Sequence, residues 1–200
     1  MISTGIRAVK IEIRVIGIDD GPFNPMEGGK CLLVGAIYRG SSSLEGVEAT
    51  WIDVDGMDVT DRIVEMIMGS KHRGQLRAIM LNGITFAGFN VADLRRISEE
   101  TGLPVIAIVE REPHLDQIGN ALRNLPNYEL RWQIIKRTGS PVPLRIPPRR
   151  RPIYAHAINI SLERAREMIE RTRNRSAIPE PLRAAHLISS AFKNRVEARP

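Results

Sequence analysis

Two adjacent carboxylates follow a strongly apolar run near the start of the chain. Asp19 and Asp20 come directly after Val15–Ile18, and Gly21 and Pro22 then end the run. Apolar, β-branched residues of this kind predict a buried central strand. Two anionic side chains at the end of such a strand are costly unless a cation meets them. Mg²⁺ binds through one or two carboxylates and substrate phosphate oxygens, so the pattern indicates a metal site. The alternative is a plain Asp-Asp-Gly-Pro turn without chemistry.

Further polar side chains fall where two other predicted strands end. Asp53 lies at the end of a predicted strand over about 47–54, Asp55 and Asp58 follow it, and Asn82 follows a short strand over 77–81. Asp53 and Asp55 share a face if the strand alternates, and Asp55 or Asp58 could then reach the site of Asp19. The strand before Asn82 is expected to end beside the first strand, which directs the Asn82 side chain toward the same ion. Each of these residues is equally typical of a solvated turn or a helix cap.

The elements that must position these side chains alternate along the chain. We predict strands over about 11–19, 30–38, 47–54, 77–81, 103–109 and 153–158. We predict helices from about 59, from Asn90 as N-cap to about 101, over 114–124, over 161–172 and from 178, whereas 128–136 is ambiguous. The first three strands have short connections and should be antiparallel. Strands joined through helices then make a mixed α/β sheet with helices on its faces, the element order of the ribonuclease H-like architecture.

Composition limits the class of protein. Two hundred residues suit a single domain over 1–200, and 29 Lys and Arg against 23 Asp and Glu give a net charge of +6. This balance favours an anionic partner such as nucleic acid. The one cysteine, Cys31, excludes an intramolecular disulfide and a cysteine zinc site, and its apolar surroundings predict a buried structural thiol. No segment resembles a transmembrane helix or a signal peptide, so we expect a cytoplasmic protein without a membrane partner.

Three blocks of sequence resemble one family. The blocks are Gly17–Phe23 (GIDDGPF), Met80–Val91 (MLNGITFAGFNV) and Ile178–His186 (IPEPLRAAH). Together they are similar to the archaeal endonuclease dU family. That family is related to endonuclease V, which shares the Pro-Glu-Pro-x-Arg helix start and the ribonuclease H-like fold. The resemblance extends from about Ile11 to about Phe192.

The resemblance implies an endonuclease, dependent on Mg²⁺ or Mn²⁺, that hydrolyses phosphodiester bonds in DNA containing deaminated bases such as deoxyuridine. Asp19 matches the metal ligand of the first strand, and Asp20 is a neighbour that assists. Asp55, with Asp58 in reserve, is the candidate for the second acidic position. His186 falls where the related helix carries a histidine or aspartate near the metal.

Asn82 departs from the family pattern, because an aspartate ligand is expected at this position. Losing a carboxylate weakens the attraction for Mg²⁺, although a neutral oxygen still coordinates. Slower catalysis, a shifted metal preference and a site that binds without cutting all remain open. The alternative function is therefore a weakened or inactive nuclease-like module that binds nucleic acid or a repair partner. A phosphatase or nucleotide-processing enzyme on the same fold is a third possibility.

A basic stretch completes the candidate site. Residues 139–152 (GSPVPLRIPPRRRP) contain five prolines and four arginines, which predicts an extended loop. It is either a solvated linker or an arm that contacts phosphates. The candidates for binding the nucleic-acid backbone are Arg149, Arg150, Arg151, Arg183, Lys71, His72 and Arg73. Such contacts give affinity but not base choice.

Overall fold

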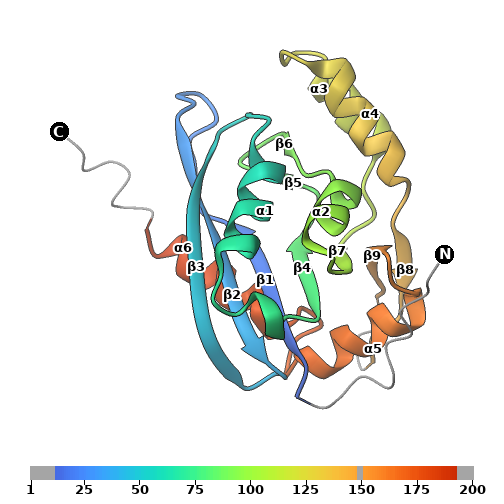
Figure 1. The fold of residues 1–200 in the computed structure, drawn as a ribbon. Coiled ribbons are helices and arrows are strands. Elements are labelled where there is room, and N and C mark those ends of the chain that lie inside the picture. The colour runs from blue at the N-terminus through green and yellow to red at the C-terminus, as the bar shows by residue number, and fades with distance from the viewer. Residues whose placement is uncertain (1–11, 148–150, 193–200) are drawn as a thin grey trace.

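A seven-stranded mixed sheet runs through the centre of the computed structural model, which describes residues 12–147 and 151–192 (Figure 1). The strand order is β3-β2-β1-β4-β7-β9-β8. The strands are β1 (Arg14–Asp20), β2 (Lys30–Arg39), β3 (Ser43–Asp53), β4 (Ala78–Asn82), β7 (Val105–Val109), β8 (Val142–Leu144) and β9 (Ile153–Ile158). Two short strands, β5 (Thr85–Phe86) and β6 (Asn90–Val91), form a separate hairpin.

The strand directions define two edges of the sheet. β1, β2 and β3 form an antiparallel meander, whereas β1, β4 and β7 are parallel neighbours, as predicted for a mixed sheet. β9 runs antiparallel to β7, and β8 runs antiparallel to β9. The carboxyl ends of the parallel strands therefore all lie on one side of the sheet. We call this row of strand ends the site edge, and Asp20, Asn82 and Val109 lie there. The opposite end, the far edge, carries Arg14 and Arg39.

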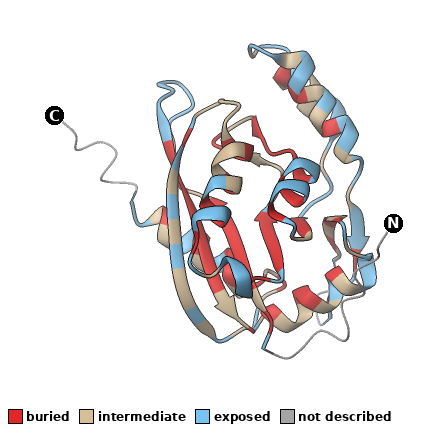
Figure 2. Ribbon diagram, in the orientation of Figure 1, coloured by how far each residue is buried: buried red, intermediate tan, exposed pale blue. Residues whose placement is uncertain are grey.

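Helices cover both faces of the sheet (Figures 1 and 2). They are α1 (Val59–Gly69), α2 (Leu94–Thr101), α3 (Leu115–Leu122), α4 (Tyr128–Thr138), α5 (Leu162–Thr172) and α6 (Glu180–Ser190), with a 3₁₀ turn at Arg73–Gln75. Ile16 of β1 packs into the core under α1 and α2, and Val15 into the core under α5 and α6. Successive β1 residues thus face opposite layers. Within the described residues, no helix has the length and apolar character needed to cross a membrane.

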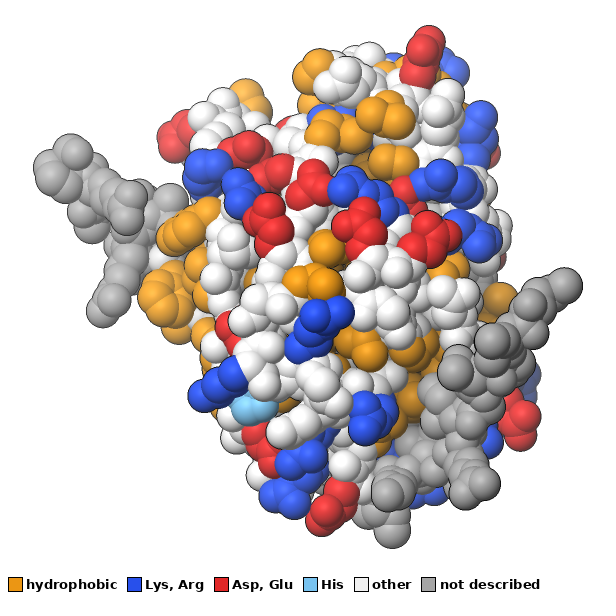
Figure 3. Space-filling view, viewed as in Figure 1, with side chains coloured by type: hydrophobic (Ala, Val, Ile, Leu, Met, Phe, Trp, Pro, Cys, Tyr) orange, Lys and Arg blue, Asp and Glu red, His pale blue; other side chains and the backbone are white. Residues whose placement is uncertain are grey.

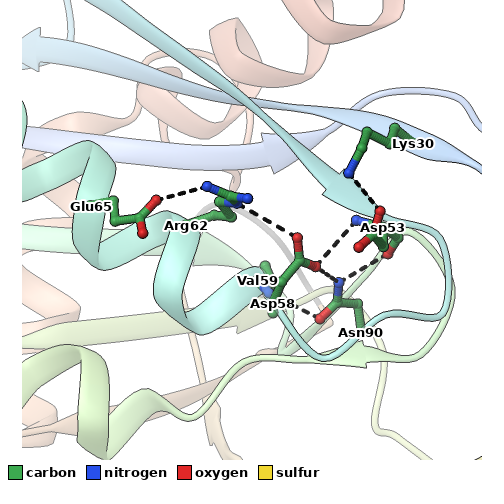
Figure 4. Close-up of polar contacts among 7 residues, drawn as sticks. All are labelled: Lys30, Asp53, Asp58, Val59, Arg62, Glu65 and Asn90. Carbon is green, nitrogen blue, oxygen red and sulfur yellow. Dashed lines mark hydrogen bonds and ion pairs between the residues drawn. The ribbon is translucent and has the colours of Figure 1, made fainter.

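The prediction that Asn90 begins a helix is wrong. Asn90 lies in β6, and Asp93 is the N-cap of α2, where its carboxylate accepts a hydrogen bond from the Arg96 N–H at 3.2 Å. The Asn90 side chain instead accepts a hydrogen bond from the Val59 N–H at 3.1 Å (Figure 4). Asn90 therefore satisfies a free donor at the start of α1, a different helix.

Two further segments differ from the sequence expectations. The ambiguous stretch at 128–136 is helical, as α4. The predicted loop at 139–152 contains the strand β8, which forms the outer strand of the sheet. Pro143 lies in β8 opposite Tyr154. Proline is tolerated there because an edge strand leaves one side without partners.

Cys31 confirms its prediction as a buried thiol. Its side chain is fully buried at the start of β2 and donates to the Gly21 carbonyl oxygen at 3.2 Å. Burial, the largest cause, raises the pKa of the thiol to about 12. Because the thiolate is the reactive form, this cysteine is chemically inert near neutral pH.

Candidate active site

Asp19 is a buried carboxylate at the site edge. Asp19 is only 2% exposed, and its Oδ2 lies 3.0 Å from His186 Nδ1. Oδ1 accepts a hydrogen bond from the Asp20 N–H at 3.0 Å. Burial and, second, the neighbouring Asp20 charge raise the pKa of Asp19 to about 6, although a hydrogen bond from Asn82 and the proximity of His186 act in the opposite direction. Asp19 is thus a desolvated acid held in a fixed orientation.

The packing of α6 against β1 places His186 beside this carboxylate. A side chain at Gly17 would overlap the backbone of Pro181 in the first turn of α6, so glycine allows the close approach. Near the other end of the helix, the Ser189 hydroxyl donates to the Asp20 carbonyl oxygen at 2.8 Å. These contacts fix α6 along β1. The His186 side chain is 62% exposed, so it joins a buried acid to solvent.

Asn82 reaches the same place from β4. The parallel pairing of Ile18 with Leu81 sets the two strand ends side by side, which confirms the predicted neighbourhood. The Asn82 side chain is exposed and lies close enough to Asp19 to lower the pKa of its carboxyl. Asp19, Asn82 and His186 therefore converge from three elements that are far apart in sequence.

Asp20 and Asp55 belong to the other layer. Alternate residues of β1 face opposite layers, and Asp20 Oδ2 accepts a hydrogen bond from the Ala87 N–H at 2.5 Å. The Asp19 and Asp20 carboxyls still lie close enough for each to affect the pKa of the other. The Asp55 N–H donates to the Ala87 carbonyl oxygen at 2.8 Å, and Asp55 Oδ1 accepts from the Phe89 N–H at 2.8 Å. The structure thus joins Asp55 to the Asp20 network, and the role of Asp55 as a metal ligand stays a prediction.

The reserve candidate, Asp58, is engaged in local structure (Figure 4). Its Oδ1 accepts from the Asn90 side chain at 2.7 Å and from the Asp53 N–H at 3.2 Å, and its other oxygen pairs with Arg62. The Asp53 carboxylate pairs with Lys30 at 2.7 Å. These contacts correspond to the turn role that the sequence left open. Asp58 is the N-cap residue of α1, but its side chain makes no capping hydrogen bond.

The donors at Asp19 suit a hard divalent cation. In the described ranges, no three or more His, Cys, Asp or Glu side chains group closely enough to hold a metal ion. The donor set is instead one carboxylate and one amide oxygen, with the His186 imidazole adjacent. No described Lys or Arg forms an ion pair with Asp19 or Asp20, and burial raises the pKa of both acids. A bound cation would relieve this shortage of positive charge, so the residues fit Mg²⁺ or Mn²⁺.

Two of the predicted basic residues belong to segments that lead to the site edge. Arg183 precedes His186 by one turn of α6, is 54% exposed on its side chain and pairs with Glu180 at 3.0 Å. Arg151 is exposed and comes three residues before Tyr154, which pairs with Val109 at the end of β7.

The other basic candidates lie elsewhere. Arg149 and Arg150 fall outside the described residues. Lys71, His72 and Arg73 follow α1, which begins at the site edge and runs along the sheet. The His72 ring lies against Gly46, near the beginning of β3, where a Cβ atom would meet Nε2 at 2.9 Å. These three residues are therefore at the far edge, and the structure does not bring them to Asp19.

One buried cation was missed by the sequence interpretation. Arg131 of α4 is 1% exposed and donates hydrogen bonds to main-chain carbonyls, two of which belong to Asp55 and Gly56. The available signal was its position between two apolar residues, Leu130 and Trp132, with Ile134 and Ile135 one turn later on the same helix. A lone arginine in such a stretch more often marks the solvated side of a helix.

Comparisons with known proteins identify close relatives. Residues 11–193 match the model of a family described as endonuclease dU. The UPF0215 protein of Methanothermobacter thermautotrophicus is 46% identical, over 92% of this chain and 89% of its own. The UPF0215 protein of Methanopyrus kandleri is 45% identical, over 92% and 93%. A solved structure from Archaeoglobus fulgidus, described as a protein of unknown function, is 35% identical with a TM-score of 0.82, covering 90% and 98%.

More distant solved structures share the fold. Human endonuclease V is 16% identical with a TM-score of 0.62, over 94% of this chain and 87% of its own. Endonuclease V of Ciona intestinalis, solved in complex with a 24-mer DNA containing an inosine followed by a ribo-adenosine, is 13% identical with a TM-score of 0.61, over 92% and 87%. The expected ribonuclease H-like fold is thereby confirmed.

Proposed function

The chain belongs to the endonuclease dU family, and from this premise we propose that it is a metal-dependent endonuclease that hydrolyses phosphodiester bonds in DNA containing deaminated bases, deoxyuridine in particular. The observation that carries the proposal is the convergence of Asp19, Asn82 and His186 at one sheet edge. The likeness to an endonuclease V that was solved with inosine-containing DNA supports nucleic acid as the partner.

The chemistry divides between a cation and the side chains around it. Asp19 and Asn82, with His186 adjacent, would hold Mg²⁺ or Mn²⁺, which supplies Lewis-acid polarisation of the phosphate and balances its developing negative charge. Asp19 orients the His186 ring through Nδ1, which leaves Nε2 as the nitrogen that exchanges a proton with water or with the leaving oxygen. His186 is suited to this role because its side chain is largely exposed.

Substrate binding falls to the basic residues at the site edge. Arg183 and Arg151 contact backbone phosphates, which gives affinity and salt dependence without selecting a base. Selection of a deaminated base requires that the base leave the stack, and a poorly paired base is the easiest to extrude.

A cleavage assay tests the proposal directly. Oligonucleotides that contain deoxyuridine, deoxyinosine or only normal bases are incubated with the protein in Mg²⁺, in Mn²⁺ and in a chelator. We expect cleavage of the deoxyuridine strand only with metal, and loss of cleavage in Asp19→Ala. A wild-type protein that cuts none of these strands with either metal would contradict the proposal.

A second function is favoured by Asn82, since a neutral amide stands where a carboxylate would attract the metal more strongly. On this alternative the chain is a binding module that recognises nucleic acid or a repair partner without cutting it. Binding that persists in a chelator, together with no cleavage by wild type or by Asn82→Asp, would support the module. Cleavage that increases in Asn82→Asp would support the enzyme.

A further inference from the structure

The largest fully buried side chain in the described part of the chain belongs to a cation, Arg131 of α4. Its Nε donates to the Pro126 carbonyl oxygen at 3.1 Å and its Nη2 to the Asp55 carbonyl oxygen at 2.5 Å. Its Nη1 donates to the carbonyl oxygens of Gly56, at 2.8 Å, and Phe89. One guanidinium thus joins the α3–α4 turn, the loop after β3 and the loop between β5 and β6.

This arrangement uses the shape of arginine rather than its charge. A buried cation is costly unless its donors are satisfied, and here main-chain oxygens satisfy them. No Asp or Glu among the described residues forms an ion pair with Arg131, and burial lowers the pKa of the guanidinium. A lysine has the same charge but lacks the planar fork that bonds three segments at once.

The carbonyls that bind Arg131 are linked to the candidate active site by consecutive hydrogen bonds. The Phe89 N–H donates to the Asp55 carboxylate, and the Asp55 N–H donates to the Ala87 carbonyl oxygen. The Ala87 N–H donates to the Asp20 carboxylate, and the Asp20 N–H donates to the Asp19 carboxylate. The position of the loop between β5 and β6 therefore affects the positions of Asp20 and Asp19 at the end of β1.

The two loops need outside support because their backbone is strained. Asp55 and Ala87 have φ angles of 52° and 42°, in the left-handed region that residues with a Cβ atom rarely adopt. Gly88 follows with a φ of 88°, and a side chain there would overlap the Asp55 carboxylate. Strained segments of this kind persist only where surrounding contacts fix them.

We propose that Arg131 is a positioning residue for the cleavage reaction. By binding the Asp55, Gly56 and Phe89 carbonyls, it holds the loops whose Ala87 N–H fixes Asp20, and so it sets the end of β1 that carries the catalytic carboxylate. The inference rests on the proposed function. It also assigns a role to the α3–α4 hairpin (Figure 1), because α4 carries the guanidinium that binds the Asp55 and Gly56 carbonyls.

The test compares Arg131→Lys and Arg131→Gln with Ile135→Ala, a matched control one turn later on α4. Ile135 is 2% exposed and packs in an apolar cluster with Leu122 of α3 and Val91 of β6, so its truncation weakens the packing of the same helix but leaves every Arg131 hydrogen bond in place. On deoxyuridine DNA, below the melting temperature of every variant, we expect kcat to fall roughly 10- to 100-fold in Arg131→Gln with KM nearly unchanged. The kcat of Arg131→Lys should lie between those of Arg131→Gln and wild type, and the kcat of Ile135→Ala should match that of wild type.

A second measurement does not depend on activity. Amide hydrogen exchange at Ala87 and Phe89 should accelerate in both Arg131 variants and stay at the wild-type rate in Ile135→Ala. An active wild type whose Arg131 variants keep full kcat would overturn the inference, and so would equal acceleration of exchange in all three variants. An inactive wild type would overturn the proposed function instead, and the exchange rates would then decide the role of Arg131.

Discussion

At the far edge of the sheet, the Glu45 carboxylate lies between two arginines, with Arg14 Nε at 2.5 Å and Arg39 Nε at 2.7 Å. Hydrogen bonds and charge from these arginines hold the pKa of Glu45 below its usual value. At the site edge, Asp19 meets only the His186 ring as an ion-pair partner among the described residues, and burial raises its pKa. The comparison teaches that this fold neutralises a carboxylate where it only has to hold strands together. At the proposed cation site it leaves a carboxylate without a Lys or Arg partner among the described residues.

The surface of α1 and α2 resembles the far edge. Arg62 pairs with Asp58 and Glu65, and Arg96 pairs with Asp61. In the space-filling view, blue and red side chains are interspersed over this face (Figure 3). Exposed pairs of this kind contribute only about 0–1 kcal/mol each, but they leave little local charge to attract a ligand. Ion pairs are thus common on this part of the surface, whereas neither Asp19 nor Asp20 has a Lys or Arg partner among the described residues.

The largest expected effect is on kcat, and it distinguishes the function of the Asp19 carboxylate from that of Glu45. Asp19→Asn removes the charge that holds the metal and orients His186, so we expect kcat on deoxyuridine DNA to fall about a thousandfold. Glu45→Gln, the matched removal of a carboxylate at the far edge, should leave kcat within about twofold. Equal losses in the two variants would remove the distinction between the edges.

The next effect concerns stability and has the opposite sign at each edge. The folded-state pKa of Asp19, about 6, is above its unfolded value, so its stabilising effect is present below pH 4 and is lost as pH rises through 6. Without metal, Asp19→Asn should therefore gain up to about 3 kcal/mol of unfolding free energy relative to wild type between pH 4 and 7. Urea unfolding in a chelator at several pH values measures this gain.

Glu45→Gln should change the stability of the fold in the opposite direction. The lowered folded-state pKa of Glu45 stabilises the fold above the unfolded pKa and is lost as pH falls. This variant should therefore be less stable than wild type at pH 7.

Addition of Mg²⁺ should raise the melting temperature of wild type but not of Asp19→Asn, since only wild type keeps the ligand. A stability gain for Asp19→Asn that is independent of pH would contradict the assigned cause.

A smaller effect is expected from restoring a carboxylate to β4. Asn82→Asp adds a second charge beside Asp19, and we expect about a tenfold lower Mg²⁺ concentration at half-maximal activity, the equivalent of roughly 1.4 kcal/mol. In a chelator the same variant should be less stable than wild type, because two unpaired acids then repel each other. A titration of activity and melting temperature with Mg²⁺ measures both changes. A variant with no change in metal dependence would show that Asn82 does not contact the ion.

The smallest effect compares cations at the two edges. Arg151→Gln should weaken binding of single-stranded DNA about two- to fivefold and reduce the slope of log affinity against log salt by about 1. Arg73→Gln, at the far edge, should change neither quantity. Fluorescence anisotropy over a range of salt concentrations, with the catalytic Asp19→Asn background to prevent cleavage, measures both. Similar losses in the two variants would place the nucleic acid across the whole sheet.

Much of the fold follows from periodicity that can be recognised in the sequence. The apolar runs of β1, β2 and β7 are strands because they are buried on both faces. Asn90 was misassigned because Asn90 and Asp93 are both good caps, and only the pairing in β6 decides between them. The ambiguity of α4 arose because Arg131 faces inward, where a helical pattern predicts an apolar residue.

The sequence was enough to predict which strand ends meet at the candidate site. It was not enough to predict which layer of the molecule each side chain contacts. Asp19 and Asn82 meet because parallel neighbours end together, a property of the sheet. The contact of Asp20 with the loop between β5 and β6 depends on which layer its side chain faces, and this partner, the Ala87 N–H, is a main-chain group that has no sequence signature. The far-edge position of His72 follows from helix length, since the 11 residues of α1 span about 16 Å.

The buried thiol of Cys31 makes the molecule convenient for spectroscopy. Because this is the single cysteine of the chain and its pKa is about 12, maleimide and nitroxide reagents should leave it unmodified at neutral pH. A cysteine introduced at a fully accessible position, such as Met26 at 92% exposure in the loop after β1, would then be labelled alone. A dye attached there could report the arrival of DNA in real time without any change to the native thiol.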